Sequence, residues 1–233
     1  MEVGRVLSIA RYPVKSMGGE SLERVEVTPR GLAGDRTWAV RTADGRLGSG
    51  KTMARFRRVD GLLDLGARLT DGGPVIDLPD GSTYAVADPA TAPRLSALLG
   101  QPLTLHPEEP GKPHHDDSPV HLVTTASVRR LGELVGAPVD VRRLRPNLVL
   151  DVAGSGFVED GWRGRRLEVG AGVLLRLGGP MIRCAMVNAA QPGLPHDPRF
   201  LRTLAAEHDM ELGLQATVER PGAIAVGDPV RLL

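Results

Sequence analysis

The only thiol of the chain, Cys184, is the residue with the widest choice of chemistry. It follows Arg183 at the end of an apolar stretch. A thiolate beside a cation has a lowered pKa and is a good nucleophile or soft-metal ligand, whereas a thiol in apolar surroundings is inert. Free cysteines are usually buried, so Cys184 taken alone is expected to be an inert core residue, and the rest of the sequence must decide whether it does chemistry. A single cysteine excludes an internal disulfide, a self-contained iron–sulfur cluster and a zinc site of several cysteines.

A second candidate for chemistry is the segment from Gly45 to Thr52, Gly-Arg-Leu-Gly-Ser-Gly-Lys-Thr, which fits the phosphate-loop pattern. Such a loop cradles phosphates only when a buried strand precedes it and a long helix follows it. Here Asp44-Gly45 reads as a hairpin turn, and the segment Met53 to Gly61 is short, basic and soon broken by glycine. Nucleotide hydrolysis therefore stays a distant alternative.

A third candidate is His114-His115-Asp116-Asp117, whose residue types are those of metal ligands. Neighbouring side chains in an extended loop point in different directions, and the surrounding segment is polar. We therefore expect a solvated linker here, in preference to a metal site.

The whole composition restricts the class of protein. The chain has 233 residues, with 41% hydrophobic and 24% charged residues and a net charge of +1, as in a globular protein of one large or two small domains. The basic residues are scattered, so we expect no nucleic-acid partner. No apolar run is long enough to span a membrane, and Met1 to Arg5 lacks a signal-peptide pattern, so we expect a cytoplasmic protein with no membrane partner.

The elements that must position these residues are mostly strands. As far as about Leu105, short runs alternate with turns such as Asp71-Gly72-Gly73 and Asp80-Gly81. Helical spacing of leucines predicts a helix over Thr91 to Leu99, ending at Gly100. The expected strands of this half are Val3 to Ala10, Leu22 to Val27, Arg36 to Arg41, Leu62 to Leu69, Pro74 to Leu78 and Thr83 to Val86.

The polar segment from Glu108 to Ser118 is the expected junction, which divides the chain into domains 1–107 and 108–233. Beyond it the pattern predicts a helix over Ala126 to Val135, with Thr125 as its N-cap, and a second over Arg199 to Glu207. Short, closely spaced strands favour a barrel or sandwich over a doubly wound sheet. The expected strands are Val120 to Val123, Asn147 to Asp151, Arg166 to Val169, Val173 to Leu177, Ala185 to Val187, Leu214 to Glu219 and Pro229 to Leu232.

Separated segments of the chain carry a resemblance to a known family. They are Tyr12-Pro13-Val14-Lys15-Ser16, Gly31 to Trp38, Arg145 to Val149, Glu159 to Trp162, Arg183-Cys184 and Arg220 to Val230. In this order and spacing they resemble the MOSC family, named for the C-terminal part of molybdenum cofactor sulfurase. The characterised members that the chain looks like are the mitochondrial amidoxime-reducing component and its bacterial relatives. The resemblance implies a mainly β fold: a β-barrel MOSC domain with a few peripheral helices, preceded by a smaller β-rich N-terminal domain.

The resemblance also implies a cofactor, the molybdenum cofactor or molybdopterin. Cys184 would be the molybdenum ligand and the catalytic residue, because a thiolate is a soft donor that suits this metal. Arg183 would lie beside it at the cofactor. The residues implied to hold the pterin and its phosphate are Lys15, Ser16, Arg36, Arg145 and Asn147, with Asp117 and Ser118 on a loop that approaches the cofactor.

The implied activity is an oxidoreductase that reduces N-oxygenated small molecules. With one cysteine the chain would take electrons from an external donor such as a flavin or iron–sulfur reductase. The family is associated with pyridoxal phosphate binding as well. The residues after Cys184, Ala185-Met186-Val187-Asn188, differ from the threonine-rich run of the reductases. An alternative therefore stays open, a carrier of cofactor or sulfur in which Cys184 is the metal ligand or holds a persulfide.

Overall fold

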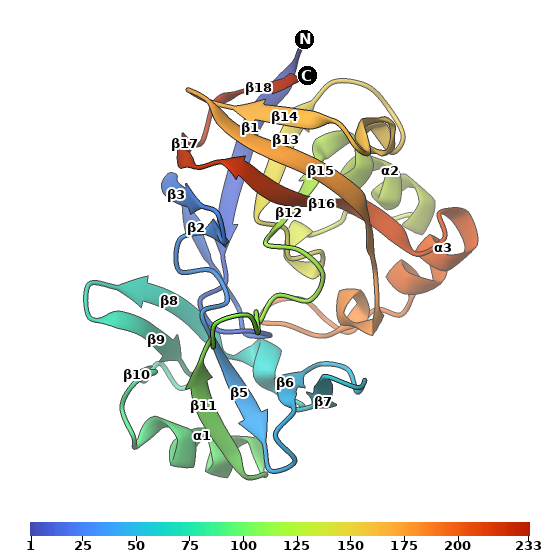
Figure 1. The fold of residues 1–233 in the computed structure, drawn as a ribbon. Coiled ribbons are helices and arrows are strands. Elements are labelled where there is room, and N and C mark those ends of the chain that lie inside the picture. Colours follow the sequence, from blue (N-terminus) through green and yellow to red (C-terminus); the bar gives the residue numbers. More distant parts are fainter.

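Strand β1 (Glu2–Arg11) forms part of a barrel wall, and its pairing register shifts between Val6 and Ser8. Val6 and Ile9 are buried whereas Leu7 between them is exposed. In the computed structural model, which describes residues 1–233, β1 pairs with β13 along one edge and with β18 along the other. These pairings close seven strands into a barrel, in the order β13-β12-β16-β15-β14-β18-β1, so the prediction of a β-barrel is confirmed (Figure 1).

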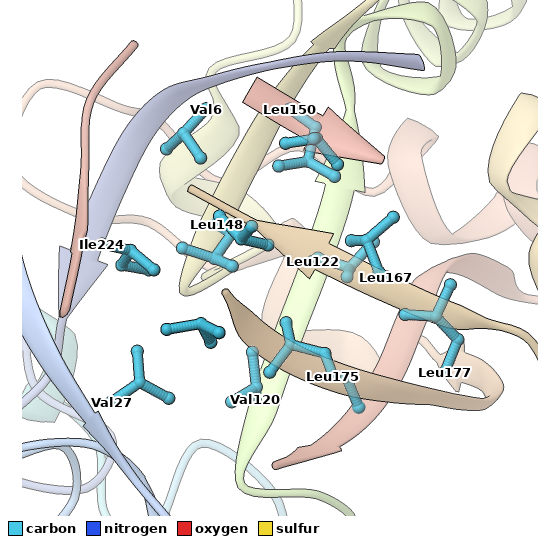
Figure 2. Packing of buried hydrophobic residues seen from close by; sticks show 14 of the residues in the cluster. Val6, Val27, Val120, Leu122, Leu148, Leu150, Leu167, Leu175, Leu177 and Ile224 are labelled. Atoms are coloured by element: carbon cyan, nitrogen blue, oxygen red, sulfur yellow. The ribbon is translucent and has the colours of Figure 1, made fainter. Parts of the chain in front are cut away.

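The other strands of this eight-stranded sheet are β2 (Glu20–Leu22), β12 (Val120–Thr124), β13 (Leu148–Val152), β14 (Arg166–Val169), β15 (Val173–Ile182), β16 (Glu211–Arg220) and β18 (Pro229–Leu232). A three-stranded sheet of β3 (Arg24–Thr28), β4 (Gly31–Leu32) and β17 (Gly222–Ala225) lies against one end of the barrel. Its Val27 and Ile224 pack into the same core as the barrel residues Leu122, Leu148 and Leu175 (Figure 2). The two sheets therefore share one interior.

Helices cover the outside of the barrel. They are α2 (Thr125–Val135) and α3 (Arg199–Glu207), with short 3₁₀ turns η2 (Val141–Arg143), η3 (Val158–Trp162) and η4 (Ala185–Asn188). The side chain of Thr124 accepts a hydrogen bond from the Ser127 N–H and caps α2, so the choice of Thr125 as N-cap is wrong by one residue. The expected strand over Ala185 to Val187 is wrong too, because this stretch forms η4.

A smaller unit with its own hydrophobic core lies below the barrel in the view of Figure 1, and we call it the small unit. It contains the sheet β5 (Trp38–Thr42), β6 (Leu47–Ser49), β7 (Phe56–Arg58) and β11 (Leu103–Pro107), the sheet β8 (Gly66–Thr70), β9 (Gly73–Asp77) and β10 (Thr83–Ala85), helix α1 (Thr91–Leu99) and turn η1 (Leu62–Asp64). The expected strand from Leu62 divides into η1 and β8, and β5 begins at Trp38, two residues after Arg36.

The segment 108–118 connects the small unit to the barrel and runs between them (Figure 1). The barrel contains strands from both sides of residue 107, because β1 precedes the small unit in the chain. The domain boundary at 107 itself stays a prediction. None of the helices is long and apolar enough to cross a lipid bilayer.

Candidate functional site

All nine candidate residues line one cavity, which we call the cationic pocket. They come from distant parts of the chain and from both the barrel and the loops beside the small unit. They are Lys15, Ser16, Arg36, Asp117, Ser118, Arg145, Asn147, Arg183 and Cys184.

The barrel strands position these residues at their ends. Lys15 and Ser16 follow β1, Asn147 directly precedes β13, and Arg183 and Cys184 directly follow β15. Strand β1 pairs with β13, and β15 is joined to β13 through β16 and β12. The order of strands around the barrel therefore brings together segments that are far apart in the sequence.

Three of the pocket residues have left-handed backbone conformations. Ser16, Arg36 and Arg145 have φ values of 65°, 51° and 52°, and only two other non-glycine residues of the chain have a positive φ. Such a conformation costs free energy and persists only where the surroundings enforce it, which is common at functional sites. The concentration of strained backbone here separates this pocket from the rest of the surface.

The lining of the cationic pocket carries a strong excess of positive charge. Six lysine and arginine side chains line it against two carboxylates, those of Asp116 and Asp117. The six cations are Lys15, Arg36, Lys51, Arg143, Arg145 and Arg183. An arrangement of this kind raises the local concentration of anions.

Tyr12 organises two of these arginines. The guanidinium groups of Arg36 and Arg145 lie 4.8 and 4.3 Å from the centre of its ring, which is a favourable cation–π arrangement. The Tyr12 hydroxyl donates to the Pro146 carbonyl at 3.2 Å, and burial raises the pKa of the phenol despite the nearby arginines. The Arg36 guanidinium is also paired with the carboxylate of Asp35.

Two buried arginines keep donors without a partner. The Nη2 of Arg145 and the Nε of Arg183 are buried and make no hydrogen bond. Burial lowers the pKa of each guanidinium to about 10, so both stay charged at neutral pH. Buried N–H groups in proteins nearly always have a partner. These two are therefore suited to a bound anion, which would receive charge-assisted hydrogen bonds.

Lys15 and Lys51 converge on one carboxylate. Asp116 accepts hydrogen bonds from both ammonium groups, at 2.9 Å from Lys51, and both cations lie over the ring of Phe56. The Lys15 side chain is only 5% exposed. Burial lowers the pKa of Lys15 to about 8, and the nearby carboxylate of Asp116 partly opposes that effect. The two lysines in turn hold the pKa of Asp116 far below its usual range, against the opposing effect of burial. Asp116 is thus the internal counter-ion of the pocket.

Cys184 is half-buried beside these cations, so it is not a simple core cysteine. It immediately precedes η4, whose backbone is held by Arg143. The Arg143 guanidinium donates to the carbonyl oxygens of Val187, Ala189 and Pro195 at 3.4, 3.2 and 2.6 Å. Arg143 therefore fixes the loop that carries the thiol.

Asn147 and Ser118 line the pocket and also make hydrogen bonds within the protein. The Asn147 amide accepts from the His121 N–H at 3.1 Å and donates to the Ala10 carbonyl at 3.3 Å, which ties strands β12 and β1 together. The Ser118 hydroxyl donates to the Val120 carbonyl at 2.8 Å. Both side chains form part of the wall of the pocket. Asp117 is exposed at the mouth of the pocket.

The predicted site residues do not include several other polar residues of the lining, among them Lys51, Asp116, His121 and Arg143. His121 is buried, and burial together with Arg183 holds its pKa well below the ordinary value, so its ring is neutral. The segment from Glu108 to Ser118 is mostly exposed or half-buried, as expected of a solvated linker, except that His114 is buried and Asp116 pairs with two lysines. No three histidine, cysteine or carboxylate side chains are grouped to hold a metal ion.

The phosphate-loop interpretation of Gly45 to Thr52 is wrong in its structural context. This segment forms β6, which pairs in parallel with the short strand β7, and no helix follows it. Its Ser49 and Lys51 instead line the cationic pocket, beside segments of the barrel.

Comparison with known proteins shows which family the chain matches. The model of the MOSC domain matches residues 110–231, and that of the MOSC N-terminal beta barrel domain matches residues 3–96. The molybdenum cofactor sulfurase of Solanum lycopersicum is 23% identical over an alignment 252 positions long, which covers 85% of this chain and 30% of that protein. The crystal structure of the YuaD protein from Bacillus subtilis covers 99% of this chain and 95% of that one, with a TM-score of 0.56 and 14% identity. That likeness concerns the fold alone.

Proposed function

Because this chain belongs to the MOSC domain family, we propose that its cationic pocket binds the molybdenum cofactor for the reduction of N-oxygenated small molecules by electrons from a partner reductase. One observation carries the proposal: the single thiol and six cations line the same pocket, in which two buried arginine donors lack a partner.

The donor set fits such a group at both of its ends. The pterin carries a terminal phosphate, which matches the free donors of Arg145 and Arg183 and the charge of Lys15. A thiolate is a soft ligand that suits molybdenum, and Cys184 is the only cysteine of the chain that could supply it. When bound, the cofactor supplies the redox chemistry itself.

The residues of the chain then have distinct tasks. Cys184 would hold the metal through its sulfur. Arg36 and Arg145, held on Tyr12, orient the anionic end, and Arg143 holds the loop that places the sulfur. The pocket would therefore fix the cofactor at two points.

The similarity to molybdenum cofactor sulfurase favours a second candidate, a carrier of cofactor or of sulfur. This chain spans about 30% of the length of that relative, so the activity of the whole sulfurase belongs to a larger protein. In a carrier, Cys184 would hold the metal or a persulfide without turning over a substrate. The half-buried position of the thiol beside cations suits a persulfide anion as well.

Turnover separates the two candidates. Protein from a host that makes the cofactor is given an N-hydroxylated substrate and a chemically reduced viologen as electron donor. The reductase proposal predicts turnover by the wild type and by Arg58→Gln, a control at an exposed arginine outside the pocket, and loss of turnover in Cys184→Ser. Cofactor bound without turnover, or cyanide-labile sulfur on Cys184, would instead establish the carrier.

A further inference from the structure

Residues of the small unit and of the segment 108–118 line a second cavity of about 460 Å³, which shares no residue with the cationic pocket. We call it the arginine cavity, because four cations and no carboxylate line it. These cations are Arg41, Arg46, Arg55 and Lys112. Its size lies within the range of about 300–1,000 Å³ that is usual for small-molecule sites.

Two carboxylates at the rim balance only part of this charge. Glu109 pairs with Arg41 at 3.2 Å and with Lys112 at 2.8 Å, and Asp44 pairs with Arg46 at 2.6 Å. Asp44 is shared with Arg57, which lies outside the lining. The arginine cavity therefore keeps an excess of positive charge.

Arg55 differs from its neighbours because it has no carboxylate partner. Its guanidinium donates to the carbonyl oxygens of Pro113 at 2.7 Å and of Asp116 at 3.5 Å. Carbonyl oxygens carry no net charge, so the positive charge of Arg55 has no opposite charge in contact with it. An anion in the cavity would supply one.

Buried polar atoms of this cavity also lack partners. The Nε of Arg41 makes no hydrogen bond, and neither ring nitrogen of His114 does, although His114 is only 1% exposed. Burial lowers the pKa of His114 to about 4, so the neutral ring keeps one donor and one acceptor unsatisfied. Because buried polar groups nearly always have a hydrogen-bond partner, these nitrogens are suited to contact a bound ligand.

We propose that the arginine cavity binds a phosphate group, either free phosphate or the phosphate of a small phosphorylated molecule. Guanidinium groups are planar forks that match phosphate oxygens in pairs, and a lysine adds a point charge. Gly45 to Leu47 of the former phosphate-loop pattern form part of this lining. These residues form part of the cavity wall, and Arg46 adds a positive charge to it. Binding of a phosphate here does not require the helix that follows a phosphate loop.

The test follows amide resonances by NMR during titration with inorganic phosphate or glycerol 3-phosphate. Gly45 and Gly111 report on the arginine cavity, and Ser16 reports on the cationic pocket. We expect saturable shifts at both glycines. Tighter binding of glycerol 3-phosphate would identify an organic phosphate as the ligand, and equal affinity would identify free phosphate.

Substitutions assign the shifts to the cavity. The double variant Arg46→Gln, Lys112→Gln should raise the dissociation constant at least tenfold, whereas Arg58→Gln should not change it. Arg55 is left intact because it also holds the segment 113–116. Unchanged spectra elsewhere show that the double variant is folded. The proposal is overturned if the wild-type glycines do not shift, or if they shift with the same affinity in the folded double variant.

Discussion

At the scale of single residues, the titration of Lys15 decides how the cationic pocket holds an anion. Its pKa is lowered to about 8 chiefly by burial, so the ammonium group is charged at neutral pH and loses its proton as the pH rises above about 8. An anion is attracted only by the charged form. Affinity is therefore highest below this pKa and falls above it.

Sulfate is a suitable probe, because its charge stays constant over this range. We expect its affinity for the pocket to be flat up to about pH 8 and to fall at higher pH, as followed by titration calorimetry. Lys15→Met should bind more weakly throughout and lack the fall. An equally steep fall in Lys15→Met would assign the pH dependence to another group.

Asp116 gives a second prediction at this scale. Its carboxylate raises the pKa of Lys15 against the effect of burial. In Asp116→Asn the opposition is gone, so the fall in sulfate affinity should begin at a lower pH than in the wild type. Asp117→Asn is the matched control, since Asp117 lies in the same pocket and makes no contact with Lys15. An unchanged onset in Asp116→Asn would refute the counter-ion role.

The sequence made part of this site predictable. Lys15, Arg36, Arg145 and Cys184 stand in short motifs whose order is informative, and all line the pocket. Asp116 could not be assigned, because its importance depends on Lys15 and on Lys51, which come from separate segments. His121 could not be assigned to the site either, because the only signal in the sequence was its position on an apolar strand.

At the scale of elements, strand β1 closes the barrel, and Gly4 permits the closure. A Cβ at Gly4 would lie 2.0 Å from the Asp151 carbonyl oxygen on β13. Gly4→Ala should therefore push the two strands apart and destabilise the fold by about 1–3 kcal/mol, the usual cost of overpacking.

Chemical unfolding measures this prediction. Gly179→Ala on β15 is the matched control, because a Cβ there would meet no atom within 4 Å. Its free energy of unfolding should stay within about 0.5 kcal/mol of the wild-type value. Equal stabilities of the two variants would show that the close approach of β1 to β13 is not required.

Alternation of apolar residues made most strands predictable, as in β15, where Val173, Leu175 and Leu177 face the core. It failed where tertiary contacts decide the local structure. The stretch from Ala185 has strand-like composition but forms a turn, because Arg143 binds the carbonyl oxygens of Val187 and Ala189 from another segment. Thr124 and Thr125 are equivalent caps by sequence, and only the start of α2 distinguishes them.

At the scale of the whole molecule, residues of both the barrel and the small unit line the cationic pocket. Lys51 belongs to a loop of the small unit, whereas Arg145 and Cys184 belong to the barrel. A ligand held by both should stabilise both. At a free concentration about 100 times its dissociation constant, a ligand adds roughly 2.7 kcal/mol to the free energy of unfolding.

Calorimetry of protein with and without the cofactor tests this coupling. We expect one unfolding transition that moves to higher temperature in the loaded protein. Two transitions, of which only one moves, would show that the ligand contacts a single body and that the small unit contributes nothing to binding.

The most direct test of the proposed function is the molybdenum and pterin content of protein purified from a host that makes the cofactor. With Cys184 as the metal ligand, the wild type and Arg58→Gln should carry about one equivalent of molybdenum, and Cys184→Ser should have lost it. Molybdenum retained in full by Cys184→Ser, or absent from the wild type, would contradict the assignment of this pocket as a molybdenum site.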